Sequence, residues 1–213
     1  MSVRIRSQWF RTERPKAVAE IAGAVAFIVW RVSQQVLRNM RQADFELEPG
    51  PKYFEFLSEW LIFLVHSADR AAHPRLGESR LEFTTVLSNR VGEILADNRS
   101  DLLGDDTRDD VKDRFIDLLN LRLSDYSDFE RIDYGCLRYL AGQLAHVGGP
   151  RDTVWVHDQV MEIEAPQAVE LIERGFKGLM GDTPRSRQRP AGMGGSESCG
   201  YWSGVNLDPS MST

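Results

Sequence analysis

The sequence predicts an all-α protein: a single helical bundle of five to six helices with a disordered C-terminal tail. Apolar residues recur at helical spacing through most of residues 15–180, whereas no segment alternates for long enough to build a sheet. From residue 181 the composition changes, because Gly, Pro and Ser fill 15 of the last 33 positions. We therefore divide the chain into a basic N-terminal arm (1–14), a helical bundle (15–180) and a tail (181–213).

The first helix is expected to begin near Thr12 or Pro15 and to reach about Ala43, since Thr can cap a helix and Pro is tolerated in its first turn. Its first half is rich in Ala and Gly. One apolar stripe follows the helical repeat: Val18, Ile21, Val25, Ile28, Val29, Val32, Val36 and Met40. Part of this stripe also recurs every seven residues. The helix is therefore either the spine of the bundle or a pairing surface in a homodimer.

The second helix is predicted from about Lys52 to Ala72, between the Pro-Gly-Pro of residues 49–51 and Pro74. It is apolar nearly all round, which is typical of the most buried helix in a bundle. The third helix is expected from about Glu78 to Asn98, with one apolar stripe.

The fourth helix is expected to open at Thr107, because Asp110 three residues later completes a capping signal. The fifth spans about 134–147. A sixth is capped by Asp152 or Thr153 and is expected to break at residues 164–165, because Pro166 disfavours helix in the residue before it. Its apolar pattern continues to about residue 180.

The net charge of −6 hides an uneven distribution along the chain. Residues 1–43 carry +6, residues 44–133 carry −10 and residues 134–213 carry −2. The total disfavours nucleic acid as a partner, since phosphate binding needs a positive face. The polarity favours association between unlike faces, with another protein or with a second copy.

Signatures of common enzymes are missing from the sequence. There is no P-loop, no Gly-x-Ser-x-Gly elbow and no His-Glu-x-x-His helix, so we expect a non-catalytic protein. Two cysteines do not indicate a disulfide framework. Residues 1–16 hold five basic side chains and no apolar core of the length that a secretory signal needs, so a cytoplasmic location is expected.

One polar face of the second helix offers a candidate metal site. His66, Asp69 and His73 lie on this face, together with Glu55 and Glu59. Imidazole and carboxylate groups are ligands of divalent transition metals, the one cofactor class that the sequence indicates. His66 and His73 are roughly 10.5 Å apart along the helix axis, too far to share one ion. A metal site would use Asp69 with one of the two histidines and add ligands from another helix, such as His146 or His157. In the alternative interpretation, the two ends of this face are solvated and His66 is a hydrogen-bonded core histidine.

Two charged segments have alternative interpretations. Asp106, Asp110, Asp113 and Asp117 share a helix face that is either solvated or a docking surface for a basic partner. The N-terminal arm places Trp9 and Phe10 among arginines, a pattern that can bind a membrane surface. More simply, these aromatic side chains fold back onto the bundle.

Three functional hypotheses follow from the sequence. The leading one is a helical interaction or scaffold protein that self-associates through its first helix. The second is a metal- or ligand-binding protein, or an enzyme, with its site near His66 and Asp69. The third is peripheral membrane association through the basic arm.

Overall fold

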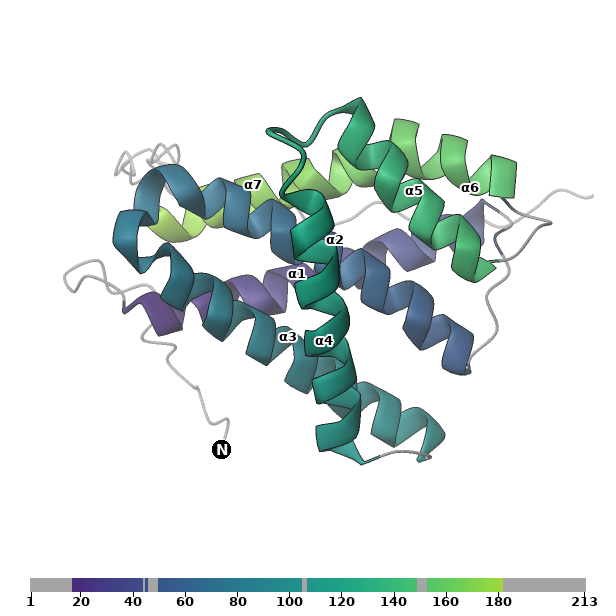
Figure 1. Ribbon diagram of the computed structural model, residues 1–213, viewed down its shortest axis with the longest axis horizontal. Helices are drawn as coiled ribbons and strands as arrows, with labels where there is room; N and C mark the ends of the chain where they lie inside the picture. Colours follow the sequence, from purple (N-terminus) through teal and green to yellow (C-terminus); the bar gives the residue numbers. More distant parts are fainter. Residues whose placement is uncertain (1–16, 44, 46–49, 105–106, 149–152, 182–213) are drawn as a thin grey trace, which may run out of the picture. The chain divides into compact units, whose positions relative to one another are not determined.

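The computed structural model describes residues 17–43, 45, 50–104, 107–148 and 153–181, and in these ranges all regular structure is helical (Figure 1). The chain divides into two units, residues 1–182 and 183–213, and every described helix belongs to the first. The helices are α1 (Val18–Gln42), α2 (Pro51–Leu76), α3 (Arg80–Leu103), α4 (Arg108–Tyr126), α5 (Tyr134–Gly148), α6 (Thr153–Gln159) and α7 (Ala165–Met180). The all-α class is confirmed. The predicted arm 1–14, and the predicted tail from residue 182 on, lie outside the described residues.

Helix α2 is the centre of the bundle, and α4 runs across it in Figure 1. It packs against α1, α3, α4, α5 and α7. Every side chain from Phe56 to Val65 is buried. Gly50 precedes the first turn in extended backbone, and Pro51 occupies that turn, where its missing N–H costs nothing. The prediction that this is the most buried helix is confirmed.

The predicted end of α2 before Pro74 is wrong. The helix continues to Leu76 and ends at Gly77, whose φ of +49° lies in the region that favours glycine. Pro74 removes only the hydrogen bond to the carbonyl of Arg70, in the last turn of the helix, where the backbone is exposed. The short 3₁₀ turn Gly77–Ser79 then joins α2 to α3.

The apolar stripe of α1 is used inside the bundle. Val25, Val29, Val32 and Val36 are buried, and α1 packs on α3, α7 and α2. Of the two interpretations of this stripe, the bundle spine is the one that the fold uses. The small residues do not all mark close helix contacts, because a Cβ added at Gly23 would have no atom within 4 Å.

Two helical glycines form a matched pair for testing this packing. A Cβ at Gly175 of α7 would lie 3.0 Å from Cδ1 of Ile28 in α1, whereas the space beside Gly23 is open. We expect Gly23→Ala to raise the free energy of unfolding by about 0.5–1 kcal/mol, because alanine is the better helix former. Gly175→Val should lower it by about 1–3 kcal/mol through overpacking. Urea unfolding followed by circular dichroism measures both, and equal effects at the two sites would contradict the α1–α7 packing.

The start of α4 follows the predicted capping signal. The Thr107 hydroxyl accepts the backbone N–H of Asp110 at 3.2 Å and donates to its carboxylate at 2.6 Å. This arrangement satisfies one of the N–H groups that a helix start leaves open, and the negative side chain is favoured by the helix dipole. The cap directs α4 back along α3, against which it packs.

The predicted break before Pro166 is absent from the structure. Helix α6 passes through a π-helical segment, Val160–Glu164, into α7 without leaving helical backbone. A π-helical turn is wider than an α-helical one, so the proline ring avoids the carbonyl with which it would otherwise clash. The Glu164 carboxylate inside this turn is buried and accepts hydrogen bonds from Asn39 at 3.1 Å and Gln159 at 3.0 Å.

Candidate functional site

The residues of the predicted metal site divide between two places. His66 and Asp69 line a hollow of about 390 Å³ between α2, α3 and α4, which we call the His66 hollow. His73 is exposed and borders a different hollow, beside Glu130 and Arg131. The side chains that line the His66 hollow are His66, Asp69, Arg70, Arg80, Leu81, Thr84, Leu123 and Ser127.

Asp69 is held by two residues from the start of α3. Arg80 donates from Nε to Oδ1 at 2.9 Å and from Nη2 to Oδ2 at 2.5 Å, and the Thr84 hydroxyl donates to Oδ1 at 2.6 Å. Burial raises the pKa of the Asp69 carboxyl, but the hydrogen bonds from Arg80 and Thr84 outweigh it and lower the pKa below its usual value. Both carboxylate oxygens therefore already have charge-assisted partners.

His66 is an uncharged side chain at neutral pH. It is 5% exposed and stacks on Tyr126 with ring centroids 4.8 Å apart. Its Nε2 has no hydrogen-bond partner in the described part of the chain. Burial lowers the pKa of His66 to about 4. The positive charges of Arg70 and Arg80 also lower this pKa, whereas the negative charge of Asp69 raises it.

This pKa predicts a stability loss in mild acid. The folded-state pKa of His66 is near 4 and the unfolded value near 6.5, so the unfolded chain binds the proton first as the pH falls. The stabilisation from His66 is complete above pH 6.5 and is lost as the pH approaches 4. Between pH 7 and pH 5 the loss from this residue is about 2 kcal/mol.

Urea unfolding at several pH values measures this loss. We expect the curve of His66→Gln to be flatter than that of the wild type by about 2 kcal/mol between pH 7 and pH 5. The control is His146→Gln, because His146 is an exposed histidine of α5. A His66→Gln curve parallel to the wild type would show that His66 is protonated in the folded state at pH 5.

The other histidines do not complete a metal site with His66. His146 and His157 are not among the residues that line the His66 hollow. Over the ranges that the structure describes, no group of three or more His, Cys, Asp or Glu side chains is arranged to hold an ion. The metal site of His66, Asp69 and His73 stays a prediction.

No local sequence pattern identifies Tyr126, Arg70 or Arg80 as residues at or near a binding site. Tyr126 is fully buried, its hydroxyl has no partner among the described residues, and burial raises its pKa well above the usual value. Arg70 donates from Nη2 to the carbonyl of Phe129, which holds the loop after α4 against α2. A sequence pattern identifies such partners only when they lie on the same helix, and these lie on different ones.

A buried ion pair between α2 and α4 borders a larger hollow. Glu59 of α2 is 4% exposed, and Arg122 of α4 donates to its two oxygens at 2.7–3.1 Å. The hydrogen bond to Glu59 raises the pKa of Arg122 above its already high value. Arg122 also lies 3.8 Å from Asp125, which accepts the Tyr139 hydroxyl. Glu59 is thus a structural partner of α4 rather than a solvated residue at a helix start.

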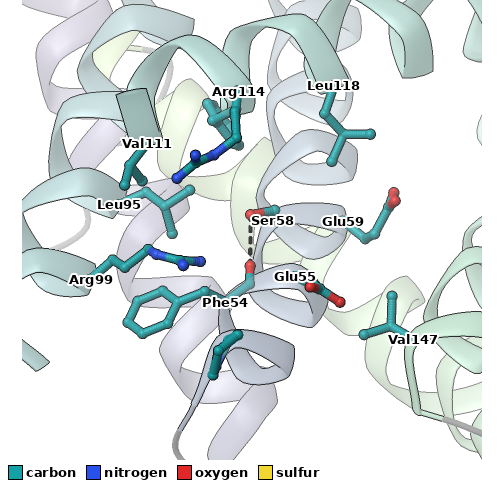
Figure 2. Close-up of a pocket in the computed structure, with 12 residues that line it drawn as sticks. Phe54, Glu55, Ser58, Glu59, Leu95, Arg99, Val111, Arg114, Leu118 and Val147 are labelled. Carbon is teal, nitrogen blue, oxygen red and sulfur yellow. Dashed lines mark hydrogen bonds between the residues drawn. The ribbon is translucent and has the colours of Figure 1, made fainter. Parts of the chain in front are cut away.

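The larger hollow has a volume of about 450 Å³ and lies between the first turns of α2, the end of α3 and the start of α4. Figure 2 shows Arg99 and Arg114 extending from two helices toward the space beside Ser58, with Leu95 and Val111 between them. Glu55 lies on the other side of this space. We call it the Arg99 hollow.

The acidic face of α4 is exposed where the structure describes it, so its role as a docking surface for a basic partner stays a prediction. Asp109, Asp110, Asp113 and Asp117 are all exposed, and Asp106 lies outside the described residues. Trp9 and Phe10 of the basic arm also lie outside them, so contact with a membrane surface stays a prediction. Within the described ranges, none of the helices has an apolar stretch of the length needed to span a bilayer.

Comparisons of the chain with protein families, with curated proteins and with solved structures find no match. A functional assignment therefore rests on the chain's own residues.

Proposed function

We propose that this protein is a binding protein for a small anion with carboxylate or phosphate oxygens, with its site in the His66 hollow. The observation that carries the proposal is the side chain of His66: a nearly fully buried imidazole, with no partner at Nε2 among the described residues, lines an open hollow. Buried polar groups are normally hydrogen-bonded, and exceptions gather at functional sites.

The charges around the hollow favour an anion over a cation. Arg70 and Arg80 carry two positive charges, Asp69 carries one negative charge, and His66 is neutral. Arg80 uses Nε and Nη2 on Asp69. A guanidinium has five N–H donors, so Arg80 can hold Asp69 and still donate to a ligand. A divalent cation would have to compete with Arg80 for the Asp69 carboxylate.

Titration with sodium malonate and with inorganic phosphate at constant ionic strength tests this proposal. The measurement is the NMR signal of the His66 ring proton on Cε1. We expect saturable shifts for at least one of the two anions, with affinity reduced about tenfold in Arg80→Gln, because a charge-assisted hydrogen bond is lost. The matched control is Arg90→Gln, an exposed arginine of the same helix that is paired with Glu93.

The alternative outcomes are distinct. A shift that sodium chloride reproduces at the same ionic strength, or that Arg90→Gln weakens as much as Arg80→Gln, would contradict an anion site. Stoichiometric zinc or manganese in protein purified without a histidine tag, lost in Asp69→Asn, would support the predicted metal site instead.

Self-association through α1 is the second candidate function. It would use the outer surface of α1 around Phe27, not the valine stripe. Phe27 lies on the outer side of α1 and is 58% exposed, beside the open space at Gly23. Arg31 lies over its ring at 5.9 Å. Large exposed aromatic side chains are enriched at interfaces, whereas the valines of α1 are already buried in the bundle.

Light scattering coupled to size exclusion tests this candidate. We expect the wild type to have the mass of a dimer and Phe27→Ser the mass of a monomer. Leu121→Ser serves as the control, because Leu121 is a comparably exposed residue of α4. A wild-type monomer at high concentration and low salt would overturn self-association.

A further inference from the structure

We propose that the Arg99 hollow is a second binding site, which takes an amphiphilic organic anion: an apolar body with one carboxylate, sulfonate or phosphate group. This inference goes beyond the proposed function, because it concerns a different hollow and a different class of ligand. It rests on the shape of the hollow, on its apolar wall and on the two arginines that enter it.

The apolar wall defines the body of the ligand. Leu95, Val111 and Phe115 line the hollow and are almost fully buried, and Phe54 and Leu118 extend this surface from α2 and α4. At about 450 Å³ the hollow falls within the range of small-molecule sites. The wall of the His66 hollow has only two aliphatic side chains, Leu81 and Leu123.

The two arginines define the head group of the ligand. Arg99 comes from α3 and Arg114 from α4, and Figure 2 shows both side chains directed at the same space. The Arg99 guanidinium lies 5.8 Å from the centre of the Phe54 ring, which fixes its position over an apolar surface. A guanidinium group has five N–H donors, so Arg99 and Arg114 can each keep a partner within the fold and still donate to an anion in the hollow.

The remaining polar groups of the hollow orient the ligand. The Ser58 hydroxyl donates to the carbonyl of Phe54 at 2.6 Å, so its proton is already used. Glu59 is bound to Arg122, and Glu55 is exposed on the opposite side of the hollow in Figure 2. The acidic head group therefore lies on the side of Arg99 and Arg114, away from the carboxylate of Glu55.

Two fluorescent probes with similar aromatic bodies test this site in the full-length protein. 8-Anilinonaphthalene-1-sulfonate carries one sulfonate, and N-phenyl-1-naphthylamine carries no charge. We expect one saturable site that prefers the sulfonate probe. Arg99→Gln and Arg114→Gln should each weaken its binding about tenfold and leave the uncharged probe nearly unchanged. Leu118→Trp, which fills the hollow and keeps both charges, should weaken both probes.

Controls separate this site from others and from misfolding. Arg138→Gln removes an exposed arginine of α5 and should change neither affinity. His66→Gln should leave both probes bound, so a failure of the anion proposal for the His66 hollow leaves this test intact. Near-ultraviolet circular dichroism identifies variants that lose their tertiary packing by unfolding; for such a variant Arg99→Met or Arg114→Met, which also removes the charge, replaces the glutamine variant. Equal affinities for the two probes, or sulfonate binding that Arg99→Gln and Arg114→Gln leave unchanged, would overturn the proposal.

Discussion

Replacing Arg122 with alanine should lower the free energy of unfolding by about 3–5 kcal/mol, because it leaves the Glu59 carboxylate buried without its partner. Glu59 is 4% exposed, and Arg122 donates to both of its oxygens. The buried carboxylate then has no partner to compensate its charge, which destabilises the fold. Urea unfolding at pH 7, followed by circular dichroism, measures the loss.

A double variant distinguishes the net contribution of the ion pair from the penalty of leaving one of its charges buried alone. We expect Glu59→Gln combined with Arg122→Met to be far less destabilising than Arg122→Ala alone, because no buried charge remains. Arg174→Ala is the matched control, since Arg174 forms an exposed pair with Glu170 on α7. Its loss should stay below about 1 kcal/mol. Similar losses for Arg122→Ala and Arg174→Ala would contradict a buried ion pair.

Replacing Phe63 with alanine should also cost about 3–5 kcal/mol, through a cavity at the centre of the bundle. Phe63 is fully buried, and its ring contacts Trp60 and Tyr126 with centroid separations of 6.1 Å each. Because α2 packs against five other helices, the cavity wall belongs to several elements and has little freedom to collapse.

The same urea experiment measures this effect, with Leu121→Ala as the control. Leu121 is 56% exposed, so its truncation should change the free energy of unfolding by less than about 0.5 kcal/mol. Phe63→Leu should fall between the two, because leucine refills part of the space. A loss below 1 kcal/mol for Phe63→Ala would contradict the central position of α2.

The elements that could be predicted from the sequence are those that local chemistry decides. The burial of α2 follows from a run of apolar residues on all its faces, and the start of α4 follows from Thr107 and Asp110. The two helix boundaries that were predicted incorrectly both lie at prolines. Pro74 is tolerated in an exposed last turn, and Pro166 is accommodated by a π-helical segment. Both outcomes depend on the surroundings of the helix rather than on its own sequence.

The candidate site was predictable only in part. His66 and Asp69 lie three residues apart on one helix, so their proximity can be read from the sequence. Arg80, Thr84 and Arg122 come from other helices, and their pairing with Asp69 and Glu59 depends on how α3 and α4 cross α2. The charges of Arg70 and Arg80 favour an anion in the His66 hollow, so the choice between a metal and an anion needs the fold.

The hydrogen bond from Asn39 to Glu164 joins two segments that are 125 residues apart in the chain. Helix α7 also covers α1 and α2, both of which leave the ribosome long before it. Until residues 165–180 have been synthesised, the apolar faces of α1 and α2 lack one of their covering helices. The bundle therefore closes late during translation, and the growing chain passes through a period in which its most apolar helix is open to aggregation.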